Sequence, residues 1–186
     1  MNTLVVYYSH TGNNAYLARK LATDLQADIE PIRPRLNVFG FLLISSWLGI
    51  SFGVRKLKHV VGNYDLIVLT GPIWTGQLIS PLRCFLKQNK KSIRQLFFIT
   101  NCGGSDAIRD DKFGYNKVFA KVHALLGARV KGCAELPIPL IVPEEHPEQG
   151  VTVMKTRLSD INFKSPMTER YQQILSDIGV RSMTSV

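Results

Sequence analysis

The chain has 186 residues, a length typical of one domain that buries a sizeable core. Lysine and arginine number 23 against 14 acidic residues, which gives a net charge of +9. Such a charge favours acidic or anionic partners. The basic residues are dispersed and no nucleic-acid-binding signature accompanies them, so we expect no nucleic acid partner.

The cysteine content indicates a reducing compartment. Cys84, Cys102 and Cys133 are widely spaced and odd in number, which argues against a disulfide framework. The chain enters a predicted strand within about three residues of its start, which leaves no room for a signal peptide. We therefore expect a cytoplasmic protein.

The stretch 3–14, TLVVYYSHTGNN, joins a predicted strand to a predicted helix through a polar loop. Residues 4–8 form an apolar run typical of a buried strand, and apolar residues recur at helical spacing over 17–25. Backbone N–H groups at a helix N-terminus, with nearby hydroxyls, favour a phosphate. The spacing matches neither G-x-G-x-x-G nor G-x-x-x-x-G-K-[ST], which argues against a dinucleotide-binding fold and against a P-loop NTPase.

The remaining chain alternates strands with helices. We predict further strands at 27–33, 65–71, 95–100 and 129–136, a helix that begins with Ser80 as N-cap and Pro81 in its first turn, and a helix over 112–126. This alternation predicts an α/β three-layer sandwich around a five-stranded parallel sheet in the order 2-1-3-4-5, within a single domain over 1–186.

An insertion of about 36–58 follows the second strand and begins with an uncharged run over 36–54. Basic residues bound the run, namely Arg33, Arg35, Arg55, Lys56 and Lys58. Its length suits a transmembrane helix, but a span there would separate two strands of one sheet. We favour a crossover helix with a hydrophobic loop, partly buried on the sheet. A lid over a cofactor, a surface for a partner subunit such as a homodimer, and a membrane interface stay open.

The C-terminal part is predicted to add a helical extension over about 150–180. A proline-rich segment, 137–147, precedes two predicted helices at 151–161 and 165–179. We expect one of them to cover the sheet and the other to be an appendage.

Loops after strands one, three and four should converge, because ligands bind at the carboxyl ends of strands in doubly wound sheets. Trp74, after strand three, suits stacking on a flat ring, and Gly103 and Gly104, after strand four, let backbone N–H groups approach it. Cys102 is a candidate reactive thiol. No C-x5-R, no G-x-S-x-G and no clustered histidines are present, so we expect no phosphatase, serine hydrolase or metal site.

Three segments, YYSHTGNN, DLIVLTGPIWTGQLISPLRCFL and FFITNCGGS, resemble the flavodoxin family over about residues 2–136. The resemblance implies a flavodoxin-like fold and non-covalent FMN. It implies phosphate contacts from Ser9, His10, Thr11, Gly12, Asn13 and Asn14, although Asn14 stands where a threonine is usual. It implies flavin-ring contacts from Pro72, Ile73, Trp74, Thr75, Gly76, Asn101, Cys102, Gly103 and Gly104. Asp106 is the nearest carboxylate in sequence to the expected ring site.

The resemblance implies a redox function. We expect an electron carrier with a redox partner protein, for which the basic surface favours an acidic one, or electron transfer to a small quinone-like acceptor. One alternative is an NAD(P)H-dependent quinone or flavin reductase, whose pocket the insertion would line. Another is a cofactor-free interaction module on the same fold.

Overall fold

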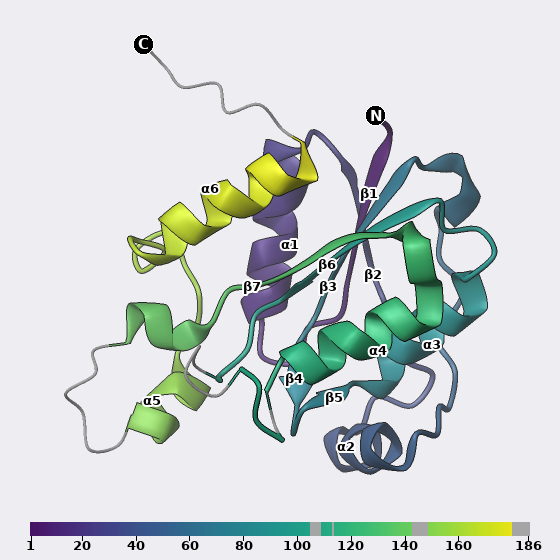
Figure 1. Ribbon diagram of the computed structural model, residues 1–186. Coiled ribbons are helices and arrows are strands. Elements are labelled where there is room, and N and C mark those ends of the chain that lie inside the picture. Colours follow the sequence, from purple (N-terminus) through teal and green to yellow (C-terminus); the bar gives the residue numbers. More distant parts are fainter. Residues whose placement is uncertain (105–108, 113, 143–148, 180–186) are drawn as a thin grey trace.

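The computed structural model describes residues 1–104, 109–112, 114–142 and 149–179 (Figure 1). A five-stranded parallel sheet has the order β2-β1-β3-β6-β7. These strands are β1 (Thr3–Tyr7), β2 (Asp28–Pro31), β3 (Leu66–Thr70), β6 (Gln95–Thr100) and β7 (Val130–Glu135). Counted along the chain within the sheet, the order is 2-1-3-4-5, which confirms the predicted α/β sandwich.

Helices cover both faces of this sheet (Figure 1). On one face lie α1 (Asn13–Asp24) and α6 (Met167–Ile178), and on the other lie α3 (Ser80–Asn89) and α4 (Asn116–Leu126). Every residue of β3 is buried, as expected for a strand covered on both sides. Of the two predicted C-terminal helices, α6 is the one that covers the sheet.

Short elements complete the described chain. β4 (Ile73–Trp74) and β5 (Gln77–Leu78) form a two-stranded antiparallel hairpin, which was not predicted from the sequence. Its two turn residues, Thr75 (φ 49°) and Gly76 (φ 65°), both have the positive φ that a tight hairpin turn requires. The short helices are η1 (Val61–Asn63), η3 (Gly127–Arg129), η4 (Ile138–Ile141) and α5 (Gln149–Lys155).

Three predicted helix boundaries are wrong. The helix predicted from residue 112 begins at Asn116. Ser80 is the first residue of α3 and Ile79 its N-cap, because the Ser80 hydroxyl donates to the carbonyl of Ile50 instead of capping the helix. The helix predicted to reach residue 161 ends at Lys155. Beyond it, the Ser159 N–H donates to Asn162 Oδ1 and not to a helical carbonyl, so the helix does not continue.

The insertion contains α2 (Phe39–Leu48), which packs against α3 and β5 at the periphery of the fold (Figure 1). Leu42 joins the core, whereas most of the large apolar residues around it are exposed. The expected burial on the sheet is therefore confined to a small part of the segment. No helix in the described part of the chain is long and apolar enough to cross a membrane.

Candidate functional site

A cavity of about 530 Å³ lies where the loops after β1, β3 and β6 meet. This volume is typical of small-molecule sites. The three loops converge as predicted from the strand order. Their lining residues are Thr11, Asn13, Asn14, Pro72, Ile73, Trp74, Thr75, Asn101, Cys102, Gly103 and Gly104.

The other predicted site residues lie elsewhere. Ser9, His10 and Gly12 line a neighbouring hollow of about 580 Å³. Arg33 and Arg55 line the same hollow. Gly76 lines neither space and serves the hairpin turn. Asp106, the carboxylate nearest in sequence to the expected ring site, lies outside the described residues.

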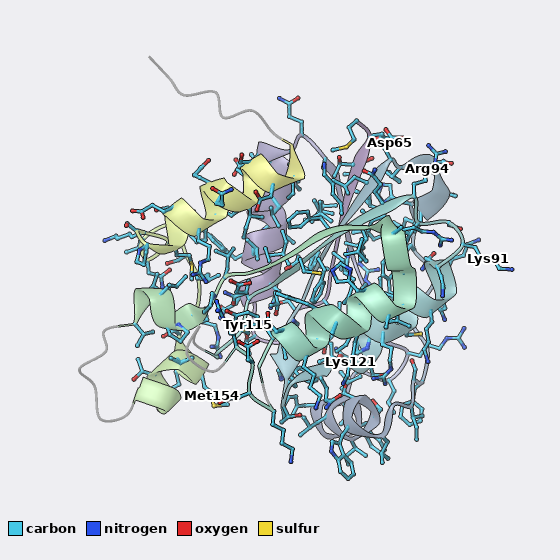
Figure 2. All side chains as sticks on the ribbon, in the orientation of Figure 1. Asp65, Lys91, Arg94, Tyr115, Lys121 and Met154 are labelled. Carbon is cyan, nitrogen blue, oxygen red and sulfur yellow. The ribbon has the colours of Figure 1, made fainter. Side chains whose placement is uncertain are left out.

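Other lining residues were not predicted from the sequence. They are Phe39 and Leu43 of α2, Val153 and Met154 of α5, and Gly114, Tyr115 and Ile138. Figure 2 shows Tyr115 where the chain enters α4 and Met154 on α5, so segments far apart in sequence meet at this edge. For Phe39 and Leu43, the only indication in the sequence was that the apolar run 36–54 could form a lid over a cofactor. No sequence pattern indicated that α5 lines the cavity.

The N-terminus of α1 is open to an anion. Gly12 precedes the helix with φ 99°, and no side chain in the described part of the chain caps the helix. The Gly12 N–H donates to Ser9 Oγ at 3.1 Å, so the loop closes on itself. Within the described residues, no acceptor is found for the N–H groups of Asn13, Asn14 and Ala15, which lie at the positive end of the helix dipole.

The side chains of Asn13 and Asn14 are engaged with the protein. Asn14 Oδ1 accepts from Thr70 Oγ1 (3.1 Å) and from the N–H of Asn101 (3.3 Å), and Asn14 Nδ2 donates to the Asn101 carbonyl (3.3 Å). Asn13 accepts from the N–H of Leu158 and donates to the carbonyl of Thr156, both at 3.0 Å. These two residues therefore offer an anion their backbone N–H groups.

An aromatic cluster borders the cavity. The ring of Trp74 is half-buried and meets Phe39 (centroids 5.1 Å apart) and His10 (5.8 Å) edge to face. His10 stacks on Phe39 at 4.7 Å. The contacts join the loop after β1, the first turn of α2 and the β4–β5 hairpin, and they fix Trp74 at the cavity wall.

The described residues that line the cavity carry no formal charge, and three of them, Phe39, Trp74 and Tyr115, have large aromatic rings. Cys102 is buried in this wall, and its Sγ lies 3.8 Å from the carbonyl oxygen of Gly104. Among the described residues, no three His, Cys, Asp or Glu side chains are grouped as a metal site. The arrangement suits a flat, polar-edged ring with an anionic group near α1.

Comparisons with known proteins establish the fold. No family model and no curated protein matches the sequence. Among solved structures, a flavoprotein from Lactobacillus acidophilus in complex with FMN is 19% identical, with a TM-score of 0.59, over 72% of this chain and 92% of that one. A protein from Bacteroides eggerthii designated a flavoprotein is 16% identical (TM-score 0.63), over 97% and 99% of the two chains.

Flavodoxin 1 from Bacillus cereus is 14% identical to this chain, with a TM-score of 0.51, over 98% of this chain and all of that one (100%). With the strand order of the sheet, these similarities define the class: the protein has the flavodoxin-like fold.

Proposed function

We propose that this protein binds FMN non-covalently in the cavity between the loops after β1, β3 and β6 and acts as a redox protein of the cytoplasm. The observation that carries the proposal is a cavity whose described lining is uncharged and partly aromatic, beside the N-terminus of α1, which no described side chain caps. The FMN held by the similar Lactobacillus acidophilus flavoprotein supports it. When bound, FMN supplies the electron-transfer chemistry, and the protein supplies binding and access.

Different residues bind the phosphate and the flavin ring. The backbone N–H groups of Asn13, Asn14 and Ala15 and the hydroxyl of Thr11 bind the phosphate. Trp74 and Tyr115 contact the flat ring and exclude water from it. Gly103 brings its loop close to α5, since a Cβ there would lie 3.2 Å from Val153 Cγ1.

Titration with FMN and with riboflavin, followed by flavin fluorescence and calorimetry, tests the proposal. We expect one FMN per chain, and riboflavin binding weaker by at least about tenfold because it lacks the phosphate that α1 binds. Trp74→Ala should weaken FMN binding by about tenfold. Trp47→Ala is the matched control, because Trp47 lies outside the cavity, and it should leave FMN affinity unchanged.

Failure to bind either flavin would contradict the proposal and favour a cofactor-free interaction module. Equal affinity for FMN and riboflavin would contradict the phosphate site at α1. An equal loss of affinity in the Trp74 and Trp47 variants would contradict the assignment of the cavity.

A second hollow favours a small acceptor as the electron-transfer partner. It measures about 440 Å³, lies between α2 and α4, and shares Leu43 and Thr75 with the main cavity. Ile44 and Trp47 line it on one side, and it also borders on two lysines. A quinone-like ring fits such a space beside a bound flavin, as an NAD(P)H-dependent quinone or flavin reductase requires. The carrier with an acidic protein partner is the other version.

A further inference from the structure

The helix α2 presents its apolar side to solvent and its polar side to the protein. Ser45 and Ser46 are each 2% exposed, whereas Trp47 is 72% and Ile44 57% exposed. The large apolar residues of this surface, here called the α2 face, are Val38, Phe39, Phe41, Ile44, Trp47, Leu48, Ile50 and Phe52, all at least 46% exposed. Large apolar side chains exposed together on one segment are typical of an interaction site.

Specific polar contacts hold α2 in this orientation. The Ser80 N–H donates to Ser46 Oγ at 2.8 Å. The Arg83 guanidinium donates to the carbonyls of Ser45 (3.0 Å), Ser46 (3.2 Å) and Ile50 (2.7 Å) at the C-terminal end of α2. Carbonyls at a helix C-terminus lack helical partners, so the cation of Arg83 satisfies them. The fold itself therefore keeps the α2 face outward.

Exposed arginines lie at the base of the insertion, where its two ends, 33–35 and 53–55, meet. The segments 33–35 and 53–55 pair with each other through the N–H of Arg35 to the Gly53 carbonyl (3.2 Å) and the N–H of Arg55 to the Arg33 carbonyl (2.8 Å). Arg33, Arg35 and Arg55 are all exposed, and no carboxylate of the described residues forms an ion pair with them. An exposed positive cluster thus stands beside the α2 face.

One carboxylate anchors the end of this base. Glu30 in β2 accepts the N–H groups of Lys58 (2.6 Å) and His59 (2.8 Å), and His59 Nδ1 lies 2.7 Å from it. Burial alone would raise the pKa of Glu30, but these hydrogen bonds outweigh burial and lower the pKa. The carboxylate is therefore satisfied within the protein. It fixes the cationic segment to the sheet.

We propose that the α2 face and the cations at its base dock onto the interface of an anionic lipid bilayer. A short helix that projects from the fold can bury apolar side chains at the headgroup boundary, while nearby cations contact anionic headgroups (Figure 1). Trp47, the most exposed residue of the face, belongs to a residue type that favours this boundary.

Charge favours the bilayer over a second copy of the chain. Two copies that met through the α2 face would bring the same arginines together, on chains of net charge +9 each, and like charges repel. A bilayer of anionic lipid supplies charge of the opposite sign over the whole face. The uncharged run 36–54 also holds no acidic residue that would oppose this contact.

Co-sedimentation with vesicles tests the proposal. The full chain is mixed with vesicles of phosphatidylcholine, with or without phosphatidylglycerol, at about 0.1 M salt. We expect binding to the anionic vesicles at least about tenfold stronger than to neutral ones. Ile44→Asp with Trp47→Asp, and separately Arg33→Gln with Arg35→Gln and Arg55→Gln, should each weaken binding by about hundredfold.

Two controls accompany these variants. Ile161→Asp changes an apolar side chain that is 80% exposed and does not belong to the α2 face, and the variant should bind vesicles like the parent chain. Circular dichroism confirms that each variant is folded. In Trp74→Phe the remaining tryptophan is Trp47, whose emission should shift to shorter wavelength with anionic vesicles.

Absence of vesicle binding would overturn the proposal, as would equal loss in the Ile161 variant. Light scattering distinguishes the other occupants: a dimer that the α2 variants dissociate, without vesicle binding, would make this face a subunit interface and overturn the proposal. The measurement is made with and without FMN, and a chain that takes up no flavin but binds anionic vesicles supports this inference while contradicting the proposed function.

Discussion

Asn14 connects the ends of three strands through one side chain. It lies after β1, and it is hydrogen-bonded to Thr70 at the end of β3 and to the backbone of Asn101 after β6. The side chain is buried, with 3% exposure. A threonine in the same place has no carboxamide with which to make this set of contacts. The departure from the usual flavodoxin pattern therefore has a structural explanation in this chain.

Asn14→Ala should lower the free energy of unfolding by about 2–4 kcal/mol, because it leaves the polar groups of Thr70 and Asn101 buried without their partner. The melting temperature should fall by about 5–10 °C in a thermal scan followed by circular dichroism. Gln88→Ala, on the exposed side of α3, is the control and should change stability by less than about 0.5 kcal/mol. An equally small change in Asn14→Ala would contradict the assigned contacts.

At the scale of elements, α2 shows why a helix can be predicted without its orientation. An uncharged apolar run predicts a helix or loop, and burial of its apolar side is the usual expectation. Here Arg83 and Ser80, far along the chain, bind the serine side of α2 instead. Burial lowers the pKa of the Arg83 guanidinium, whose nitrogens donate to α2 carbonyls.

Arg83→Met should release α2 from α3 while leaving the sheet folded. Amide hydrogens of 39–50 should exchange at least about tenfold faster, and trypsin should cut faster at the basic residues around the insertion, because the carbonyls of α2 lose their donors. Arg83→Lys keeps the charge but lacks the planar guanidinium. Its amide exchange rates in 39–50 should therefore lie between those of the parent chain and those of Arg83→Met.

Arg94→Met is the matched control for this experiment. Arg94 pairs with Asp65 at 3.2 Å on the surface, at the opposite end of the sheet from α2 (Figure 2). Exposed pairs contribute little, so exchange in 39–50 should not change. If Arg83→Met also left exchange in this segment unchanged, the guanidinium would not be what holds α2.

At the scale of the whole molecule, charge separates the two versions of the redox function. The net charge of +9 is spread over the chain, so attraction to an acidic protein is long-ranged and weakened by salt. A small neutral quinone that reaches the hollow between α2 and α4 senses this field little. The two versions therefore differ in salt dependence.

For a carrier, the rate of electron transfer to an acidic acceptor protein should fall by at least about tenfold between about 0.05 and 0.5 M salt. Reduction of a neutral quinone should change by less than about twofold over the same range. Stopped-flow absorbance of the flavin measures both rates. A salt-independent rate with the acidic protein would contradict the carrier, and a lack of quinone reduction would contradict the reductase.

The order of the sheet and the convergence of its loops could be predicted from the amino-acid sequence. Apolar runs, helical spacing and turn residues are local features, and the chirality of crossovers converts their order into the sheet order β2-β1-β3-β6-β7. The positions of Thr11, Trp74 and Cys102 at the cavity followed from that order. Element ends were less predictable, because side chains such as Asn162 compete locally with the helix.

The distant residues that complete the cavity, and the side of α2 that faces solvent, depend on how the whole chain packs. Tyr115 and Met154 carry no local signal that they line the same cavity as the loop after β1. Nor does any local pattern connect Arg83 with the carbonyls of α2, because η1, β3, β4 and β5 lie between α2 and α3 along the chain. The physical reason is that periodicity reports how a segment folds on itself, whereas its partners depend on where the rest of the chain is packed.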